Sequence, residues 1–211
     1  MSGRILRFSV ALVFLLVFSV AAYADITGTW EITGTAKQKV SIRGHSSLEQ
    51  ATVTDQFVFG EDWVFSMTDL PPEANARWGY VKKKFAVYLD DSYLISSITD
   101  IMIDGLESEG YTVEISNPTI TKNAFIGKEM KDGTIKGKWT LIYSAYLYLV
   151  DYGRGFNMKY KSTIKFTGVQ AAGPGILGLG PNESDELAGD SIQGIITEAV
   201  RDRIREALTE I

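Results

Sequence analysis

Hydrophobic and polar residues alternate along most of the chain between residues 26 and 168. In the segment 26–42, the even positions carry mostly apolar residues or glycine, and the odd positions are polar, with many threonines. A period of two sends successive side chains to opposite faces, so this pattern predicts a half-buried strand. Gly28 and Gly34 lie on the apolar face, where a missing side chain lets a strand coil sharply, as the strands of a barrel must.

Similar alternation predicts seven further strands, at residues 48–59, 62–68, 78–89, 111–116, 119–130, 134–150 and 156–168. Short turn sequences separate most of them, including Asp132-Gly133, which suits a tight hairpin, and a break at Asn117-Pro118. About eight strands joined mostly by short turns predict an all-β fold. We expect an antiparallel up-and-down eight-stranded barrel, with a sandwich as the alternative.

Two segments depart from the strand pattern. Residues 91–109 have helical spacing and predict one inserted helix, with Asp90 and Asp91 near its N-terminus and Gly110 at its end. Residues 191–211 predict a C-terminal amphipathic helix. Its apolar face would consist of Ile192, Ile195, Ile196, Ala199, Ile204, Ala207, Leu208 and Ile211.

The predicted domain organisation has four parts. Residues 1–24 form a signal peptide and residues 25–170 the β-barrel domain. Residues 171–190 form a Gly/Pro-rich and acidic linker, and residues 191–211 the helical tail.

The N-terminus predicts export. Arg4 and Arg7 precede an apolar stretch at residues 8–22, and Ala22-Tyr23-Ala24 is a small-x-small cleavage pattern. The apolar stretch is short for a membrane span, so we expect cleavage after Ala24 and no permanent membrane anchor. The chain has no cysteine, which favours a bacterial protein that is periplasmic or secreted.

Charge narrows the predicted partners. Cleavage would leave 19 basic and 26 acidic residues, a formal charge of −7, because the signal peptide holds two of the 21 basic residues and no acid. A phosphate backbone requires a basic stripe on the protein. We therefore predict that nucleic acid is not a partner.

Gly28-x-Trp30 in the first strand, followed by an antiparallel meander, resembles the lipocalin-like (calycin) superfamily over residues 25–169. The resemblance implies an eight-stranded barrel with the tryptophan at its closed end and a helix packed outside. It also implies that the barrel holds a small hydrophobic molecule. The family's Thr-Asp-Tyr motif is not evident in this chain, and the predicted helix falls within the barrel segment.

Aromatic residues supply the candidate binding site. An eight-stranded barrel is wide enough to hold one small apolar ligand or to be filled by its own side chains, and both interpretations remain open here. The predicted lining residues are Trp30, Phe57, Phe59, Phe85, Trp139, Tyr143 and Tyr160. The helix 91–109 is predicted to close one mouth as a lid, through Leu94, Ile98 and Met102.

The sequence offers few candidate catalytic residues. His45 is the only histidine, and it is either a general base beside Ser46 or Ser47 or a solvated loop residue. Asp100 and Asp104 would lie on the same face of the helix 91–109. They are either ligands of a hard cation or part of the solvent-exposed side of the helix. The glycine-rich segment 173–180 lacks the Lys-Ser/Thr of a phosphate loop. We predict no enzyme, no metal site and no cofactor.

Three functions follow in order of preference. The first is an exported lipocalin-like protein that binds or carries a small hydrophobic ligand in the barrel interior. The second is a non-catalytic structural or assembly module, whose segment from Ile192 to Ile211 docks on a partner or self-associates. The third is a small outer-membrane β-barrel, which the lysine-rich outer face of the last strand disfavours.

Overall fold

The computed structural model describes residues 26–43 and 45–171. The predicted signal peptide, almost all of the linker and the predicted C-terminal helix lie outside the described residues. The described chain forms eight strands, one α-helix and two short 3-10 helices. In chain order they are β1 (Gly28–Ile42), β2 (His45–Phe59), β3 (Phe65–Met67), η1 (Pro72–Ala74), β4 (Arg77–Val81), β5 (Lys84–Tyr88), α2 (Asp91–Glu107), β6 (Val113–Glu129), β7 (Ile135–Leu149), η2 (Val150–Tyr152) and β8 (Arg154–Gln170).

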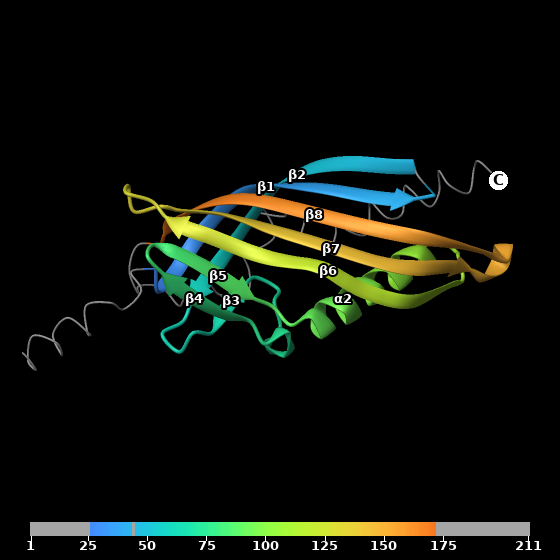
Figure 1. Cartoon of the computed structure of the whole chain (residues 1–211), viewed down its shortest axis with the longest axis horizontal. Helices are drawn as coiled ribbons and strands as arrows, with labels where there is room; N and C mark the ends of the chain where they lie inside the picture. Colours follow the sequence, from blue (N-terminus) through green and yellow to red (C-terminus); the bar gives the residue numbers. More distant parts are fainter. Residues whose placement is uncertain (1–25, 44, 172–211) are drawn as a thin grey trace, which may run out of the picture.

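All eight strands are antiparallel and form one sheet in the order β3-β2-β1-β8-β7-β6-β5-β4. The first and last strands of the chain pair with each other, so the sheet curls into a nearly closed barrel (Figure 1). Because β3 pairs only with Phe57–Phe59, the rest of β2 has no strand on that side within the described residues. At the end with the short strands, the opening lies between β3 and β4. It is bridged by a Val64–Arg77 pair and by the Trp78 N–H, which donates to the Trp63 carbonyl at 3.0 Å. The predicted eight-stranded antiparallel barrel is thus confirmed in this nearly closed form.

Long and short strands divide the barrel into two halves. The five long strands run most of the length of the molecule, while β3, β4 and β5 gather at one end (Figure 1). We call that end the short-strand half. Along β1, β7 and β8 nearly every second side chain is buried, as the alternation predicted, and β8 shows this from Phe156 to Phe166. On β2 and β6 many inward side chains are only half-buried.

The helix α2 lies against β6 at the other end of the barrel (Figure 1), which we call the helix half. Asp90 caps the helix, because its carboxylate accepts from the backbone N–H groups of Ser92 at 2.7 Å and Tyr93 at 3.3 Å. Gly110, with φ of 87°, lets the chain leave the helix toward β6. The helix predicted for residues 91–109 is therefore confirmed, and it ends two residues earlier.

Residues 78–89 do not form the single predicted strand. They belong to the hairpin of β4 and β5, which turns at Lys82 and Lys83 with φ values of 51° and 66°. Two successive residues with positive φ suit the right-handed twist of a hairpin, but glycine or asparagine usually supplies them. Because the turn consists of two lysines, the sequence offered no turn signal at this position.

The prediction for residues 111–130 is also wrong, but in the opposite direction. The two strands predicted there are one strand, β6, which pairs with β7 on both sides of Asn117-Pro118. Asn117 has φ of 52°, and the register shifts between Ser116 and Thr119, so the predicted break is a bulge. The two errors compensate, and the predicted total of eight strands is correct.

Candidate functional site

The interior of the short-strand half is filled by aromatic rings. Phe125 lies at the centre of this cluster, with its ring centroid 5.4 to 5.7 Å from those of Phe57, Phe65, Phe166 and Trp139. Most of these pairs meet edge to face, an arrangement that aromatic rings favour. Eight rings form what we call the aromatic cluster. They are Phe57, Phe59, Phe65, Trp78, Phe85, Phe125, Trp139 and Phe166.

Four residues predicted to line a ligand cavity belong to this cluster, namely Phe57, Phe59, Phe85 and Trp139. Trp30, a fifth, is 2% exposed near the start of β1, and its indole N–H donates to the Ile26 carbonyl at 2.8 Å. These side chains pack against one another. In this half, the arrangement therefore matches the filled-core interpretation.

Interior glycines make room for the rings. Gly127 pairs with Phe85 across β6 and β5, and Gly137 pairs with Phe166 across β7 and β8. A Cβ atom added at either glycine would lie 2.2 Å from the ring of its partner. The missing side chains thus allow the rings to lie flat over the neighbouring strand.

Tyr143 and Tyr160, the other predicted lining residues, lie next to each other in the helix half. They are directly opposed across β7 and β8, and both are fully buried. The Tyr143 hydroxyl lies 2.8 Å from the Thr99 hydroxyl on α2, which ties the helix to the inside of the barrel. The predicted lid residues Leu94, Ile98 and Met102 are buried on the same helix.

A row of polar side chains crosses the interior beside these tyrosines. Gln38 on β1 is paired with Glu49 on β2 and with Ser162 on β8, and Tyr160 lies two residues before Ser162 on the same face. We call these four residues the interior polar cluster. Gln38 is 1% exposed, Ser162 5% and Tyr160 0%.

Three members of the interior polar cluster have unsatisfied polar atoms. Within the described part of the chain, neither amide atom of Gln38 has a hydrogen-bond partner, nor do the hydroxyls of Tyr160 and Ser162. An unpaired buried polar group costs about 1–3 kcal/mol, so three together are unusual in a protein interior.

The burial of the two tyrosines shifts their pKa values. Burial raises the pKa of the Tyr160 phenol well above its ordinary value, and the Glu49 carboxylate adds to this shift. The neighbouring Ser162 hydroxyl lowers the pKa, although the two hydroxyls do not meet the geometry of a hydrogen bond. Burial also raises the pKa of the Tyr143 phenol, against the hydrogen bond with Thr99. Both phenols are therefore neutral at physiological pH, and each can donate one hydrogen bond.

A groove of about 550 Å³ opens on the surface where β5 diverges from β6. Asn123 lines it, but its amide is already engaged. The amide nitrogen donates to the Leu89 carbonyl at 3.0 Å and to the Asp91 carboxylate at 2.9 Å, and the amide oxygen accepts from the Trp139 indole at 3.1 Å. These bonds join β6, β7 and the start of α2, so Asn123 has a structural role.

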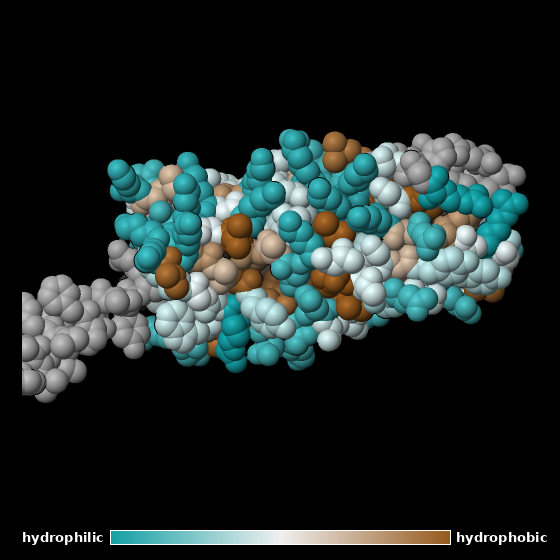
Figure 2. Space-filling view, in the orientation of Figure 1, coloured by the Kyte–Doolittle hydropathy of each residue, from teal (hydrophilic) through white to brown (hydrophobic). Residues whose placement is uncertain are grey.

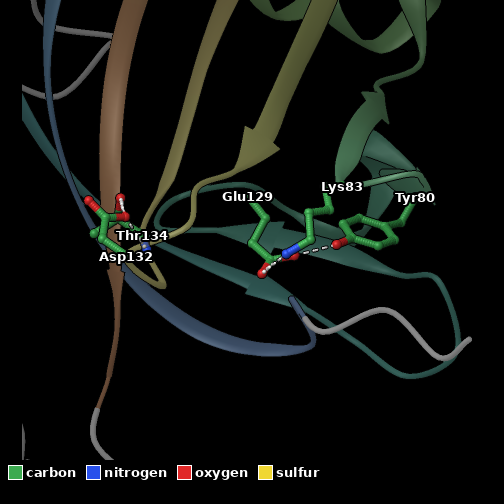
Figure 3. Close-up of polar contacts among 5 residues, drawn as sticks. All are labelled: Tyr80, Lys83, Glu129, Asp132 and Thr134. Carbon is green, nitrogen blue, oxygen red and sulfur yellow. Dashed lines mark hydrogen bonds and ion pairs between the residues drawn. The ribbon is translucent and has the colours of Figure 1, made fainter. Parts of the chain in front are cut away.

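A second polar group lies at the rim of the short-strand half (Figure 3). The Glu129 carboxylate accepts from the Tyr80 hydroxyl and from the Lys83 ammonium, the latter at 3.2 Å. Asp132 and Thr134, drawn in the same view, close the neighbouring turn with a 2.7 Å side-chain hydrogen bond. The Tyr80 hydroxyl, helped by Lys83, holds the pKa of Glu129 below its ordinary value of 4.5.

Replacing Tyr80 by phenylalanine should raise the pKa of Glu129 toward 4.5, because its main hydrogen-bond donor is removed. A depressed carboxyl pKa contributes stability above the unfolded-state pKa, and this is lost as the pH falls through the folded-state pKa. The stability difference between wild type and Y80F should therefore be present at neutral pH and vanish in strong acid. NMR titration of Glu129 and urea unfolding test this. Tyr88→Phe, at an exposed tyrosine of β5, should leave the pKa of Glu129 unchanged.

Comparisons with known proteins identify no family. No protein-family model matches the chain, and no curated protein matches it. One solved structure that aligns with it is Ail, the attachment invasion locus protein of Yersinia pestis. That protein is 10% identical, with 68% of this chain and 98% of that chain covered and a TM-score of 0.22. A DUF1329 family protein from Desulfovibrio piger is 12% identical, with 71% and 88% covered and a TM-score of 0.20. Both scores are too low to carry an argument.

The structure places the remaining sequence-based candidates on β2 and α2. His45 is the first residue of β2, paired with Ile42, rather than part of a loop as predicted. Asp100 and Asp104 are both exposed on α2, and Asp100 accepts a 3.4 Å hydrogen bond from the Ser96 hydroxyl. Within residues 26–43 and 45–171, no three metal-binding side chains come together. The segment 173–180 lies outside the described residues.

No helix in the described part of the chain is both long enough and apolar enough to cross a membrane.

Sequence reasoning missed Gln38 and Ser162. Both occupy positions whose neighbours at i±2 are apolar or aromatic, so a polar residue on the buried face of a strand was the available signal. The aromatic residues were chosen instead because large rings usually line apolar cavities.

Proposed function

We propose that the protein binds a small, mostly apolar molecule with one hydrogen-bonding polar group, inside the helix half of the barrel. The observation that carries this proposal is the set of unpaired, buried polar atoms on Gln38, Tyr160 and Ser162. Together they offer an amide that donates and accepts and two hydroxyls, all on one interior face. A ligand with a hydroxyl, amide or carbonyl group would satisfy them.

The surroundings supply the apolar part of such a site. The positions that flank the interior polar cluster along β1 and β8 are Ala36, Val40, Met158 and Ile164, with Ile42 beyond Val40. All are buried. Burying an apolar chain against such side chains contributes about 25 cal/mol per Å². Access would require α2 to move, and Leu94, Ile98 and Met102 would then act as the lid.

This proposal keeps the interior binding of lipocalin-like proteins but places it away from the aromatic cluster. Because the rings of the short-strand half pack against one another, we assign that half to stabilising the fold. The outward side chains of β7 and β8, among them Lys138, Lys161 and Lys165, also favour this proposal over an outer-membrane barrel, whose lipid-facing band is apolar. If residues 1–24 direct export, as proposed, the ligand is carried in the periplasm or outside the cell.

Native mass spectrometry of residues 25–211, purified without detergent from the exporting host, tests the proposal. We expect a discrete noncovalent mass that is released on denaturation. Gln38→Leu should abolish this mass. When both proteins are freed of ligand, it should also raise the free energy of unfolding by about 1–3 kcal/mol, because it removes an unpaired buried amide. A gain in stability with a loss of ligand is the pattern expected of a binding residue.

The matched control is Gln50→Leu, at an exposed position on the outer face of β2. It should keep the bound mass. Equal occupancy in Q38L and wild type would refute the proposed site. An apo protein whose oligomer dissociates when residues 172–211 are deleted would favour the assembly module instead.

A further inference from the structure

The outer face of the sheet is strongly basic although the chain as a whole is acidic. Strands β7 and β8 together carry six basic side chains and no acidic one. The exposed lysines extend to the neighbouring strands on both sides, and we call them the lysine face. Its members are Lys37 and Lys39 on β1, Lys84 on β5, Lys122 and Lys128 on β6, Lys136 and Lys138 on β7, and Lys159, Lys161 and Lys165 on β8.

Several of these lysines are placed directly opposite each other. Lys39 is paired with Lys161, and Lys138 with Lys165. Lys128 is paired with Lys136 on one side and with Lys84 on the other. Directly opposed like charges destabilise a sheet. The ion pair found in the described part of the chain, Lys83–Glu129, lies outside this face and neutralises none of them.

Protection against aggregation does not explain this arrangement. Charged residues are commonly placed on the edge strands of a sheet, where they prevent pairing with another molecule. Here the edge strands are β3 and β4, and all of the lysines except Lys122 lie on strand segments that are paired on both sides. A feature that costs stability and guards no edge points to an anionic partner.

Acidic side chains gather on the other side of the sheet. The helix α2 carries Asp91, Asp100, Asp104 and Glu107 and no basic residue. It packs on the interior side, where Thr99 meets Tyr143, while the lysines point outward. The molecule is therefore electrically polarised across the sheet, and an anionic surface would orient it with the lysine face inward.

We infer that the lysine face docks on an anionic membrane surface. The face is broad: it spans five strands spaced about 4.8 Å apart, and Lys159 to Lys165 covers about 20 Å along β8. Hydrophilic side chains cover the strands that cross the middle of Figure 2, with separate hydrophobic side chains between them. Ile126, paired with Lys138 and 57% exposed, is one apolar residue within the lysine face. Lysines with interspersed apolar side chains suit a plane of lipid headgroups.

A depression at one end of the lysine face strengthens this inference. It has a volume of about 810 Å³, and its lining includes Arg43, Lys159, Asn117 and Asn157 but no carboxylate. The Arg43 guanidinium lies 4.7 Å from the centre of the Phe156 ring, a cation–π contact that holds it in place. Cations with neutral amides and no acid match the chemistry of a lipid phosphate.

Vesicle co-sedimentation of residues 25–211 tests the inference, with phosphatidylcholine vesicles and with vesicles that also contain phosphatidylglycerol. We expect binding to the anionic vesicles alone, lost at high salt. The variant K39E/K128E/K138E replaces one lysine of each opposed pair. It should bind at least about tenfold more weakly, since each lysine near such a surface contributes about 1 kcal/mol. It should unfold at no lower temperature, because each substitution replaces a repulsive pair by an attractive one.

The matched control is R77E/K82E/K131E, which changes the net charge equally at exposed positions that are not members of the lysine face. It should keep most of the binding. Equal loss in both variants would mean that net charge alone acts and would overturn the inference. Failure of the wild type to bind anionic vesicles would also overturn the inference. This holds even if the protein binds a linear polyanion such as single-stranded DNA.

Discussion

Replacing Phe125 by alanine should lower the free energy of unfolding by about 3–5 kcal/mol, the range measured for large aromatic truncations in protein cores. The ring is 2% exposed and meets four others, two of them from β2 and β3 and two from β7 and β8. Its loss would leave a cavity where strands from both sides of the β3–β4 opening meet. Urea unfolding followed by tryptophan fluorescence measures the change.

The neighbouring residue provides the control for this experiment. Ile126 is 57% exposed and points away from the aromatic cluster, so Ile126→Ala should change stability by less than about 0.5 kcal/mol. A small loss in F125A, similar to that in I126A, would mean that the cluster relaxes around the gap. The short-strand half would then be loosely packed, and the proposal that only the helix half binds ligand would lose its support.

Replacing Gly137 by valine should cost about 3 kcal/mol, at the upper end of the range for overpacked sites. A Cβ atom there would lie 2.2 Å from the Phe166 ring and 2.8 Å from the Ile126 carbonyl oxygen. The ring can shift only into other rings, and the carbonyl belongs to the paired strand β6. The substitution must therefore displace either the cluster or the ladder between β6 and β7.

A double variant separates these two possibilities. Adding Phe166→Leu to G137V shortens the opposing side chain, so part of the lost stability should return if the ring is the main obstacle. Lys136→Val, at the adjacent outward position, controls for the effect of valine on the strand itself. No loss of stability in G137V would show that the missing side chain at Gly137 is not required for the packing of the Phe166 ring.

The fold was largely predictable because alternation reports burial directly. On β1, β7 and β8 nearly every second residue is buried, and this signal survives without any knowledge of pairing. The errors arose at turns. Lys82 and Lys83 adopt positive φ without a glycine, and Asn117-Pro118 forms a bulge in place of a loop. In both places the tertiary pairing of neighbouring strands overrides the local preference of the residues.

The candidate site was less predictable, because its decisive features depend on register. Gln38, Glu49 and Ser162 are far apart in the sequence and meet only through the pairing of β2, β1 and β8. The lysine face was visible only in part, through the alternating lysines of the last strand. A formal charge of −5 for the whole chain does not reveal that β7 and β8 lack acids. The net charge of a sequence does not show on which face of a sheet the charged side chains lie.

The opening between β3 and β4 has a consequence for behaviour at high concentration. A barrel that is not fully closed leaves backbone donors and acceptors along two edges, where a second molecule could add a strand. Here β3 has three residues and β4 has five, and the Val64–Arg77 bridge occupies part of the gap. At this gap the two edges are too short to template a lasting intermolecular ladder. The longer edge is the stretch of β2 from His45 to Gln56, which is paired with β1 on one side and has no strand on its other side within the described residues. Strand addition at high concentration is therefore expected at β2 rather than at the gap between β3 and β4.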